Sequence, residues 1–506
     1  MTKRPANPSE IELKLRLTQD AGGILERAPA FAGTVPEQRR ETTQYFDTPE
    51  LALAAHGFTL RIRSSGNRRV QTLKTTASEP GAASHRGEWE WEVERAEPAL
   101  DRLAETPAAA VVPDVARRLR PVFVTEIERR GRRLRIDAGT EIEAAHDRGR
   151  IAAGDADENV DELELELKQG APAALYRLAI ALHETVPMRL APESKAARGY
   201  RLRTGRAPQA VHAPKLRLRR KVRANEALRA IVGSIIGGIL ANVAAAEAGE
   251  PEGIHQLRVG LRQLRSALVL FAPMLEPNAT RLFTDELRRL GRVFGARRDR
   301  DVFCLETLPA LLESGAAAWT GPLRTLAEHD REAAQVPVLE ALHGPDFTSL
   351  ALGLATWCED GVVEPGLLGD KRWGKRLDSV APGLLDRLAG KVAKRARRTD
   401  RPERLHDLRK SLKKLRYATE FAGSLYGRKA VKRYRSRCQA LQEQLGTIND
   451  ARVTPQLVER LLDERSLELA PAIAALTAWS ARRERKARRH LHGALRGFEA
   501  SAPFWH

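Results

Sequence analysis

The chain has 506 residues, of which 42% are hydrophobic, so it is long enough for two or three domains and too apolar to be disordered throughout. Its 85 Lys and Arg residues outnumber its 66 Asp and Glu residues, and the formal net charge is +19. The three cysteines, Cys304, Cys358 and Cys438, lack metal-ligand spacing, which fits a protein of a reducing compartment.

The positive charge is unevenly distributed along the chain. Residues 1–210 contain 33 basic and 32 acidic residues, whereas residues 211–506 contain 52 basic and 34 acidic residues, an excess of +18. Such an excess attracts polyanions, so nucleic acid, an acidic membrane and polyphosphate are the candidate partners of the second part. The first part has almost no net charge, but its acidic and basic residues are grouped separately along the sequence, which points to an internal site.

Neither the N-terminal residues nor the most apolar internal stretch favours a membrane protein. The N-terminal residues lack the apolar core of a secretory signal, and we expect a cytoplasmic protein. The most apolar internal stretch, 230–246, contains Gly233, Gly237, Gly238 and Asn242. We therefore predict a buried helix there rather than a membrane span.

The first 200 residues are predicted to be mainly β-strands, because polar and apolar side chains alternate with a period of two. A helix is expected over 171–185, after the last clear strand. The alternating segments are 10–17, 58–63, 88–94 and 162–168, with a looser one at 132–137.

The polar faces of these strands are segregated by the sign of their charge, because residues two apart share a face. A solvated face of an open sheet is the simpler interpretation. However, like charges along one strand repel, and an open surface gains little from that. Clustered carboxylates suit Mg²⁺ or Mn²⁺, and Arg and Lys suit phosphate oxygens. The rows are Glu10, Glu12 and Lys14; Arg61 and Arg63; Glu88, Glu90 and Glu92; Arg133, Arg135 and Asp137; and Glu162, Glu164, Glu166 and Lys168.

These rows resemble the motifs of the CYTH, or triphosphate tunnel metalloenzyme, superfamily. The resemblance begins at Glu10-x-Glu12-x-Lys14 and covers residues 8–203. Its further motifs follow in the order Tyr45-Phe46-Asp47-Thr48, Arg61-x-Arg63, Lys74, Arg86-x-Glu88-x-Glu90, Arg129-Arg130, Asp137, Glu162-x-Glu164-x-Glu166 and Ser194 to Tyr200.

The resemblance implies an α+β N-terminal domain, residues 1–203, that forms an eight-stranded antiparallel β-barrel tunnel with Mg²⁺ or Mn²⁺ as cofactor. Whether Arg129 or Arg130 points inward stays open, as does the choice among the glutamates of 162–166. The metal-ligand candidates are Glu10, Glu12, Asp137, Glu162, Glu164 and Glu166. The triphosphate-binding candidates are Lys14, Arg61, Arg63, Lys74, Arg129, Arg133 and Lys195. The catalytic candidates are Glu10, Glu12, Lys14 and Glu164.

Residues 204–215 have the composition of a linker, and the pattern beyond them is helical and repeated. The segment Ile254 to Arg258 recurs as Leu405 to Arg409, at an offset of 151 residues, and the same offset still holds between 294–299 and 445–450. A register kept without gaps predicts two similar helical bundles, at about 216–345 and 370–500.

Each repeat predicts a helix whose apolar stripe lies beside a basic stripe. Rows of cations without interleaved aromatic residues suit phosphate chains better than bases, so nucleic acid is not the expected partner. A merely solvated basic face is the alternative, and the histidines could instead brace the bundle. The apolar stripes are Leu257, Leu261, Leu264 and Leu268, and Leu408, Leu412 and Leu415. The basic stripes are His255, Arg258, Arg262 and Arg265, and His406, Arg409, Lys413 and Arg416.

The repeated motifs resemble the CHAD domain over about residues 216–500. That resemblance implies an all-α domain of two repeated antiparallel four-helix bundles that binds long-chain inorganic polyphosphate.

The two resemblances together imply a cytoplasmic inorganic triphosphatase that converts tripolyphosphate to diphosphate and phosphate. Its helical domain would bind polyphosphate, with association with polyphosphate granules as a further expectation and no membrane partner. Two alternatives stay open. One is a non-catalytic polyphosphate-binding granule protein, and the other is an adenylate cyclase or thiamine-triphosphatase of the same superfamily.

Overall fold

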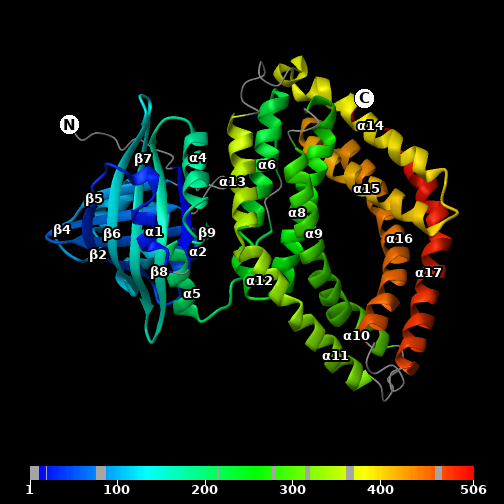
Figure 1. Cartoon of the computed structure of the whole chain (residues 1–506), viewed down its shortest axis with the longest axis horizontal. Coiled ribbons are helices and arrows are strands. Elements are labelled where there is room, and N and C mark those ends of the chain that lie inside the picture. Colours follow the sequence, from blue (N-terminus) through cyan, green and yellow to red (C-terminus); the bar gives the residue numbers. More distant parts are fainter. Residues whose placement is uncertain are drawn as a thin grey trace. The chain divides into compact units, whose positions relative to one another are not determined.

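The computed structural model describes residues 11–18, 20–75, 87–212, 216–275, 280–313, 320–360, 370–461 and 470–506. The chain divides into two compact units, and neither is one continuous stretch. The first unit comprises Met1–His212, Gly233–Gly253 and Leu342–Asp360, and the second comprises Ala213–Val232, Ile254–Ala341 and Gly361–His506. The strands are blue and cyan in Figure 1, and the later helices run from green to red.

The first unit contains a nine-stranded antiparallel sheet in the order β5-β4-β3-β2-β6-β7-β8-β1-β9. Among the described residues, the edge strands β5 and β9 each pair with one neighbour, so the predicted closed barrel of eight strands is corrected to an open sheet of nine. The extra strand, β9, has three residues, too few for alternation to reveal. The strands are β1 (Glu12–Leu17), β2 (Glu37–Asp47), β3 (Phe58–Ser65), β4 (Arg68–Thr75), β5 (Glu88–Glu92), β6 (Arg120–Asp137), β7 (Thr140–Ala153), β8 (Ala156–Gln169) and β9 (Met188–Leu190).

The alternation of side chains gives the sheet one apolar face and one charged face. In β3, Leu60 and Ile62 are buried in a cluster with Leu53, whereas Arg61 and Arg63 line a cavity on the other side. Burial of the apolar side chains therefore sets the register, and a shift by one residue would turn the arginines into the apolar core.

Short helices cover the apolar face of the sheet. The helix expected over 171–185 is confirmed as α4 (Pro172–His183), whose Leu175, Ala179 and Leu182 are buried. Helix α13 (Pro345–Asp360) packs against α4 within the first unit. The other α-helices among the described residues up to 212 are α1 (Gly22–Glu26), α2 (Ala52–Ala55), α3 (Val112–Val115) and α5 (Lys195–Thr204).

The second half of the chain is helical, and the limits of its helices reproduce the sequence repeat. Helix α8 (Pro251–Phe271) and helix α15 (Pro402–Ala422) have 21 residues each, and their limits differ by the offset of 151. A 3₁₀ turn follows each of them. The remaining α-helices are α6 (Ala224–Leu240), α7 (Val243–Glu247), α9 (Arg281–Val302), α10 (Leu308–Leu312), α11 (Thr320–Ala333), α12 (Gln335–His343), α14 (Leu377–Ala396), α16 (Arg428–Leu461) and α17 (Ala470–Glu499).

One apolar segment among the described residues, Ala224–Glu247, has the length and composition of a membrane span. It is divided between α6 and α7, and 61% of its most apolar window is buried inside the protein. Core helices of water-soluble proteins pass the same test, so this segment is weak evidence for a membrane. Its burial agrees with the helix predicted for 230–246.

Candidate functional site

A cavity of about 610 Å³ lies on the charged face of the sheet and receives side chains from β1 to β8 and from the start of α5. Acidic and basic groups line it in equal numbers. The acidic residues are Glu12, Glu41, Glu88, Glu90, Glu143, Asp147, Glu164 and Glu166. The basic residues are Lys14, Arg39, Arg61, Arg63, Lys74, Arg129, Lys168 and Lys195.

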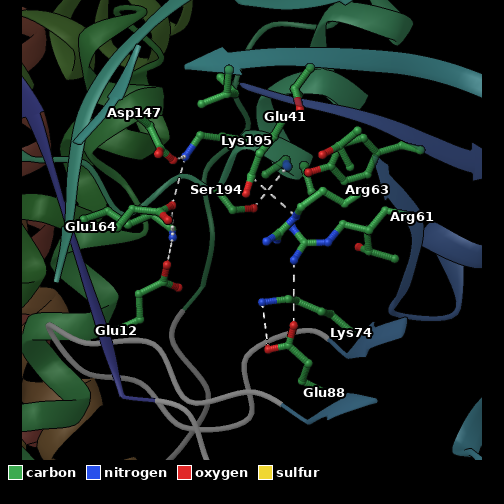
Figure 2. A pocket seen from close by; sticks show the side chains of 18 of the residues that line it. Glu12, Glu41, Arg61, Arg63, Lys74, Glu88, Asp147, Glu164, Ser194 and Lys195 are labelled. Atoms are coloured by element: carbon green, nitrogen blue, oxygen red, sulfur yellow. Dashed lines mark hydrogen bonds and ion pairs between the residues drawn. The ribbon is translucent and has the colours of Figure 1, made fainter. Parts of the chain in front are cut away.

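One side of the cavity is centred on Glu164 of β8 (Figure 2). Its carboxylate accepts hydrogen bonds from Lys14 Nζ at 2.7 Å, from Arg129 Nη2 at 2.6 Å and from Lys195 Nζ at 2.9 Å. Lys14 lies directly opposite Glu164 in the β1–β8 pairing, so the strand register creates this contact.

Three carboxylates, those of Asp147, Glu162 and Glu164, bring oxygen atoms within 4.8 Å of one another. Asp147 and Glu162 are completely buried. The Lys195 ammonium contacts all three, at 2.7 Å from Asp147 and 2.9 Å from Glu164. These carboxylates therefore already hold a cation, and a set of hard oxygen donors at this spacing suits Mg²⁺ or Mn²⁺.

Burial alone would raise the pKa of the Glu164 carboxyl, but Lys14, Lys195 and Arg129 hold it well below its usual value. The same balance acts on the amine, because burial opposes and the surrounding carboxylates, Asp147 first, raise the pKa of Lys195 well above its usual value. Both groups are therefore charged across the neutral range.

The other side of the cavity carries Arg61, Arg63 and Lys74 (Figure 2). Glu88 pairs with Lys74 at 2.9 Å and lies 3.7 Å from Arg61, and Glu41 lies 3.7 Å from Arg63. Arg61 Nε is buried and has no hydrogen-bond partner among the described residues. A buried donor of this kind is costly unless a ligand oxygen accepts from it.

Crowding of these cations affects their pKa values. The charge of Arg61, together with burial, lowers the pKa of Arg63. A bound polyanion would relieve that repulsion and accept the unpaired Arg61 Nε–H, as bidentate arginine contacts to phosphate do.

Helix α5 points its first turn at the cavity, where Ser194, Lys195, Ala196 and Ala197 are part of the lining. Ser194 caps the helix, since its hydroxyl accepts a hydrogen bond from the Ala197 N–H at 3.2 Å. The amide groups at a helix start favour negative charge, so α5 adds a partial positive charge to the cavity.

The structure gathers most of the site residues that the sequence suggested. Of the arginine pair, Arg129 lines the cavity, whereas Arg130 contacts Glu128 at 3.1 Å. Glu162 lies behind the lining and bonds Arg198 at 3.1 Å. Glu10 lies outside the described residues. The candidates that line the cavity are Glu12, Lys14, Arg61, Arg63, Lys74, Arg129, Glu164, Glu166 and Lys195.

Two candidates on β6 lie away from the cavity, which corrects their assignment. The pairing between β2 and β6 ends at Gly131, so the last residues of β6 extend beyond the cavity wall. The Arg133 side chain is 78% exposed and lies 3.7 Å from Glu141. The exposed Asp137 accepts hydrogen bonds from Gly139 N and Thr140 Oγ1 in the β6–β7 turn. Neither is retained as a ligand.

Sequence reasoning missed several lining residues, of which Asp147 is the most important. It accepts a bidentate pair of hydrogen bonds from Arg129, at 2.7 and 2.6 Å. The Ala-Ala-His segment before it hides the alternation of β7. A hairpin turn at Ala138-Gly139 nevertheless places Asp147 opposite Arg129, and this was the available signal. The other missed residues are Arg39, Glu41 and Glu143.

In the second unit, the basic stripes of the two repeats come together. Lys413 of α15 is close to Arg409 of the same helix and to Arg262 and Arg258 of α8. Burial, together with the positive charges of these three arginines, lowers the pKa of Lys413 to about 7. We call Arg258, Arg262, Arg409 and Lys413 the basic cluster. Arg409 Nε is buried without a hydrogen-bond partner in the described part of the chain.

One neighbour of the basic cluster joins the two repeats, and two others are carboxylates that partly balance its charge. Arg262 Nε donates to the Tyr417 hydroxyl at 2.8 Å, which joins the two repeats. Arg258 lies 3.0 Å from Asp299, and the corresponding Arg409 lies 3.9 Å from Asp450. The clash of like charges is thus only partly offset, as expected at a site for a polyanion.

The remaining members of the stripes lie around the basic cluster rather than in it. His406 is exposed and its Nδ1 lies 3.1 Å from Asn449 Oδ1. His255 is partly buried. Arg265 is exposed, and Arg416 pairs with Glu420 at 3.1 Å.

The charged network predicts a stability that falls in acid. The pKa values of Glu164 and Asp147 are lower in the folded protein than their usual 4.5 and 3.8. Groups with lowered pKa values stabilise the fold above those usual values, and the stabilisation is lost as the pH falls through the folded values. We expect the melting temperature to fall as the pH drops below about 4.5, and to fall less steeply in Glu164→Gln. An equal acid slope in both proteins would contradict this.

Comparison with known proteins finds two families that match successive parts of the sequence. The second match includes Gly233–Gly253 and Leu342–Asp360, which belong to the first compact unit. The CYTH domain family matches residues 8–200, and the CHAD domain family matches residues 230–459. Among solved structures, the CHAD domain from the plant Ricinus communis is 29% identical with a TM-score of 0.51, over 58% of this chain and 97% of that one.

Two further solved structures are more distant. PptA from Streptomyces chartreusis is 14% identical, with a TM-score of 0.40, over 55% of this chain and 99% of its own. HpAC1 from Hippeastrum is an adenylyl cyclase candidate with a dominant triphosphatase activity. It is 21% identical, with a TM-score of 0.30, over 39% of this chain and 96% of its own. The two family matches do not overlap and together span most of the sequence, so the chain contains a CYTH domain followed by a CHAD domain.

Proposed function

We propose that this chain is a metal-dependent triphosphatase that hydrolyses inorganic tripolyphosphate to diphosphate and phosphate. CYTH-domain enzymes act on phosphoanhydride bonds, which sets the reaction class. The observation that carries the proposal is a single cavity with a buried carboxylate cluster on one side and Arg61, Arg63 and Lys74 on the other. The first arrangement suits a divalent cation, and the second suits the oxygens of a phosphate chain.

The residues of the chain would act mainly by position and charge, because phosphoryl transfer needs little covalent work from the protein. Arg61, Arg63 and Lys74 would hold the diphosphate part and stabilise the charge that develops on it as the P–O bond breaks. Water would add to the terminal phosphorus. Glu164, which is ionised at neutral pH, is placed to orient that water or accept its proton.

Asp147, Glu162 and Glu164 would hold the metal ion, together with Glu12 from the opposite strand β1. When bound, Mg²⁺ or Mn²⁺ would neutralise phosphate oxygens and act as a Lewis acid. Lys195, which now bonds three of these carboxylates, would be free to turn toward the phosphate chain.

For the CHAD domain we propose binding of long-chain polyphosphate at the basic cluster. The supporting observations are the unpaired Arg409 Nε and the low pKa of Lys413, since both report cations held together without enough counter-charge. Binding there would keep the enzyme on its polymer, in the cytoplasm and at polyphosphate granules.

A substrate comparison separates the proposed activity from its rivals. The 610 Å³ cavity is lined by charged groups at most positions, which favours a bare phosphate chain over a nucleotide. We expect the full chain to turn over tripolyphosphate faster than ATP or thiamine triphosphate at equal concentration, with phosphate and diphosphate as products. Cyclic AMP and diphosphate from ATP would instead identify a cyclase, and binding of all three without turnover a non-catalytic polyphosphate-binding protein.

A further inference from the structure

A second concentration of positive charge lies outside the basic cluster, on helices α16 and α17. Residues 428–442 contain six basic residues and no acidic one, and residues 481–497 contain seven basic residues and one acidic residue. The two helices are consecutive and pack against each other, as Figure 1 shows in orange and red.

On α17 four arginines and one histidine form one straight row. Arg482, Arg485, Arg489, His492 and Arg496 follow spacings of three and four residues, which place them on a single helix face. All five are exposed. At 1.5 Å per residue the row is about 21 Å long.

The opposite face of α17 anchors the helix in the second unit. Ala487, Leu491, Leu495 and Phe498 are buried there. The exposed face is therefore held in a fixed orientation by apolar packing, and substitutions on it leave the core intact.

The row continues onto α16. Lys429, Arg433 and Arg437 are exposed and recur every four residues, on one face of the helix. Arg437 Nη1 lies 3.4 Å from the position that a Cβ atom on Gly497 would occupy, so its guanidinium crosses α17 beside Arg496. We call these three residues, together with the five of α17, the outer row.

Two acidic groups near the outer row are paired with arginines that do not belong to it. Glu484 bonds Arg488 at 2.7 Å, and Glu420 bonds Arg435 at 2.8 Å. Within the part of the chain that the structure describes, no carboxylate lies within ion-pair distance of the outer row. Surfaces that serve only solubility intersperse the two signs of charge, and this one does not.

We propose that the outer row is a second binding surface for linear polyphosphate, distinct from the basic cluster. A line of Arg and Lys side chains, whose Cβ atoms are about 5–6 Å apart where they are neighbours on a helix face, matches an unbranched chain of phosphates. No aromatic residue belongs to the row, and Trp479 of α17 is buried beneath Arg483, whose guanidinium lies 4.5 Å from the ring. Bases would therefore find no stacking platform, and the chemistry favours inorganic phosphate polymer over single-stranded nucleic acid.

Two surfaces on one domain would act on the same polymer. A chain that is held at one of them meets the second at a high effective concentration, which increases its residence time. The inference thus goes beyond the proposed function of the basic cluster, and each surface has its own test.

The test uses the full chain and long-chain polyphosphate across a salt series. R485Q/R489Q/R496Q removes three cations of the outer row, and R281Q/R324Q/R398Q removes three exposed cations elsewhere in the helical part as a matched control. We expect the slope of log affinity against log salt to fall by about 2 in the first variant, at about 0.7 per lost contact, and not in the second. The same loss is expected when the outer-row changes are added to R262E/K413E.

Each outcome decides the point. An equal slope in the outer-row variant and the matched control overturns the proposal. Tighter binding of single-stranded DNA than of polyphosphate at matched charge, lost in the outer-row variant, overturns the assignment of the ligand. If R262E/K413E binds polyphosphate as tightly as the wild type does, the basic cluster is not a binding site. The outer row is still tested independently by R485Q/R489Q/R496Q.

Discussion

Replacing Glu164 by Gln is expected to lower the kcat of tripolyphosphate hydrolysis by about 10²–10³-fold or more, the range seen when one charge-stabilising group is removed from a catalytic centre. Glu164 is the shared partner of Lys14, Arg129 and Lys195 and one of the three clustered carboxylates. The amide keeps the shape of the side chain but loses its charge.

The effect should fall on kcat rather than on KM. The substitution removes a negative charge from the cavity, so binding of the substrate anion should be unchanged or stronger. Glu126→Gln is the matched control, because Glu126 lies on β6 in a solvent-exposed pair with Arg150. Steady-state kinetics of both variants, with melting curves as a test of folding, provide the measurement. Wild-type turnover in Glu164→Gln would remove the carboxylate cluster from the mechanism.

Reversing two charges of the basic cluster, in R262E/K413E, should abolish most binding of long-chain polyphosphate while tripolyphosphate hydrolysis continues. Each reversal replaces an attraction to phosphate by a repulsion inside a partly buried site. The cavity of the sheet lies in the other compact unit, so short substrate should be hydrolysed at the wild-type rate. R281E/R324E, with the same change in net charge, is the control for long-range electrostatics.

The basic cluster should also make polyphosphate binding depend on pH. The pKa of Lys413 is lowered to about 7 in the free protein, and a bound polyanion raises it. Binding then takes up a proton, and the affinity should fall as the pH rises above 7. Arg cannot lose its proton in this range, so Lys413→Arg should flatten the profile. A profile that is equally steep in Lys413→Arg would show that another group is responsible.

Alternation in the sequence was sufficient to find the charged face of the sheet but not its extent. Arg61 and Arg63 were predicted on one face because Leu60 and Ile62 between them are apolar, and they do line the cavity together. Arg133 has the same parity as Arg129 and yet is exposed. The difference arises because the pairing with the neighbouring strand β2 ends at Gly131. The alternation of residues along one strand does not reveal where its neighbour ends.

The repeat illustrates a similar limit. The offset of 151 residues predicted two equivalent helices, and α8 and α15 agree with it to the residue. The repeat does not say how the two helices meet. The contact between Arg262 and Tyr417, and the resulting crowding around Lys413, depend on packing between segments about 150 residues apart.

The most direct test of the proposed triphosphatase is phosphate release from tripolyphosphate by the purified full chain, with added Mg²⁺ or Mn²⁺ and with a chelator. We predict one phosphate and one diphosphate per tripolyphosphate with metal, no release with the chelator, and recovery when metal is restored. Absence of release with every divalent cation tested, from a chain that melts as a folded protein, would contradict the proposal.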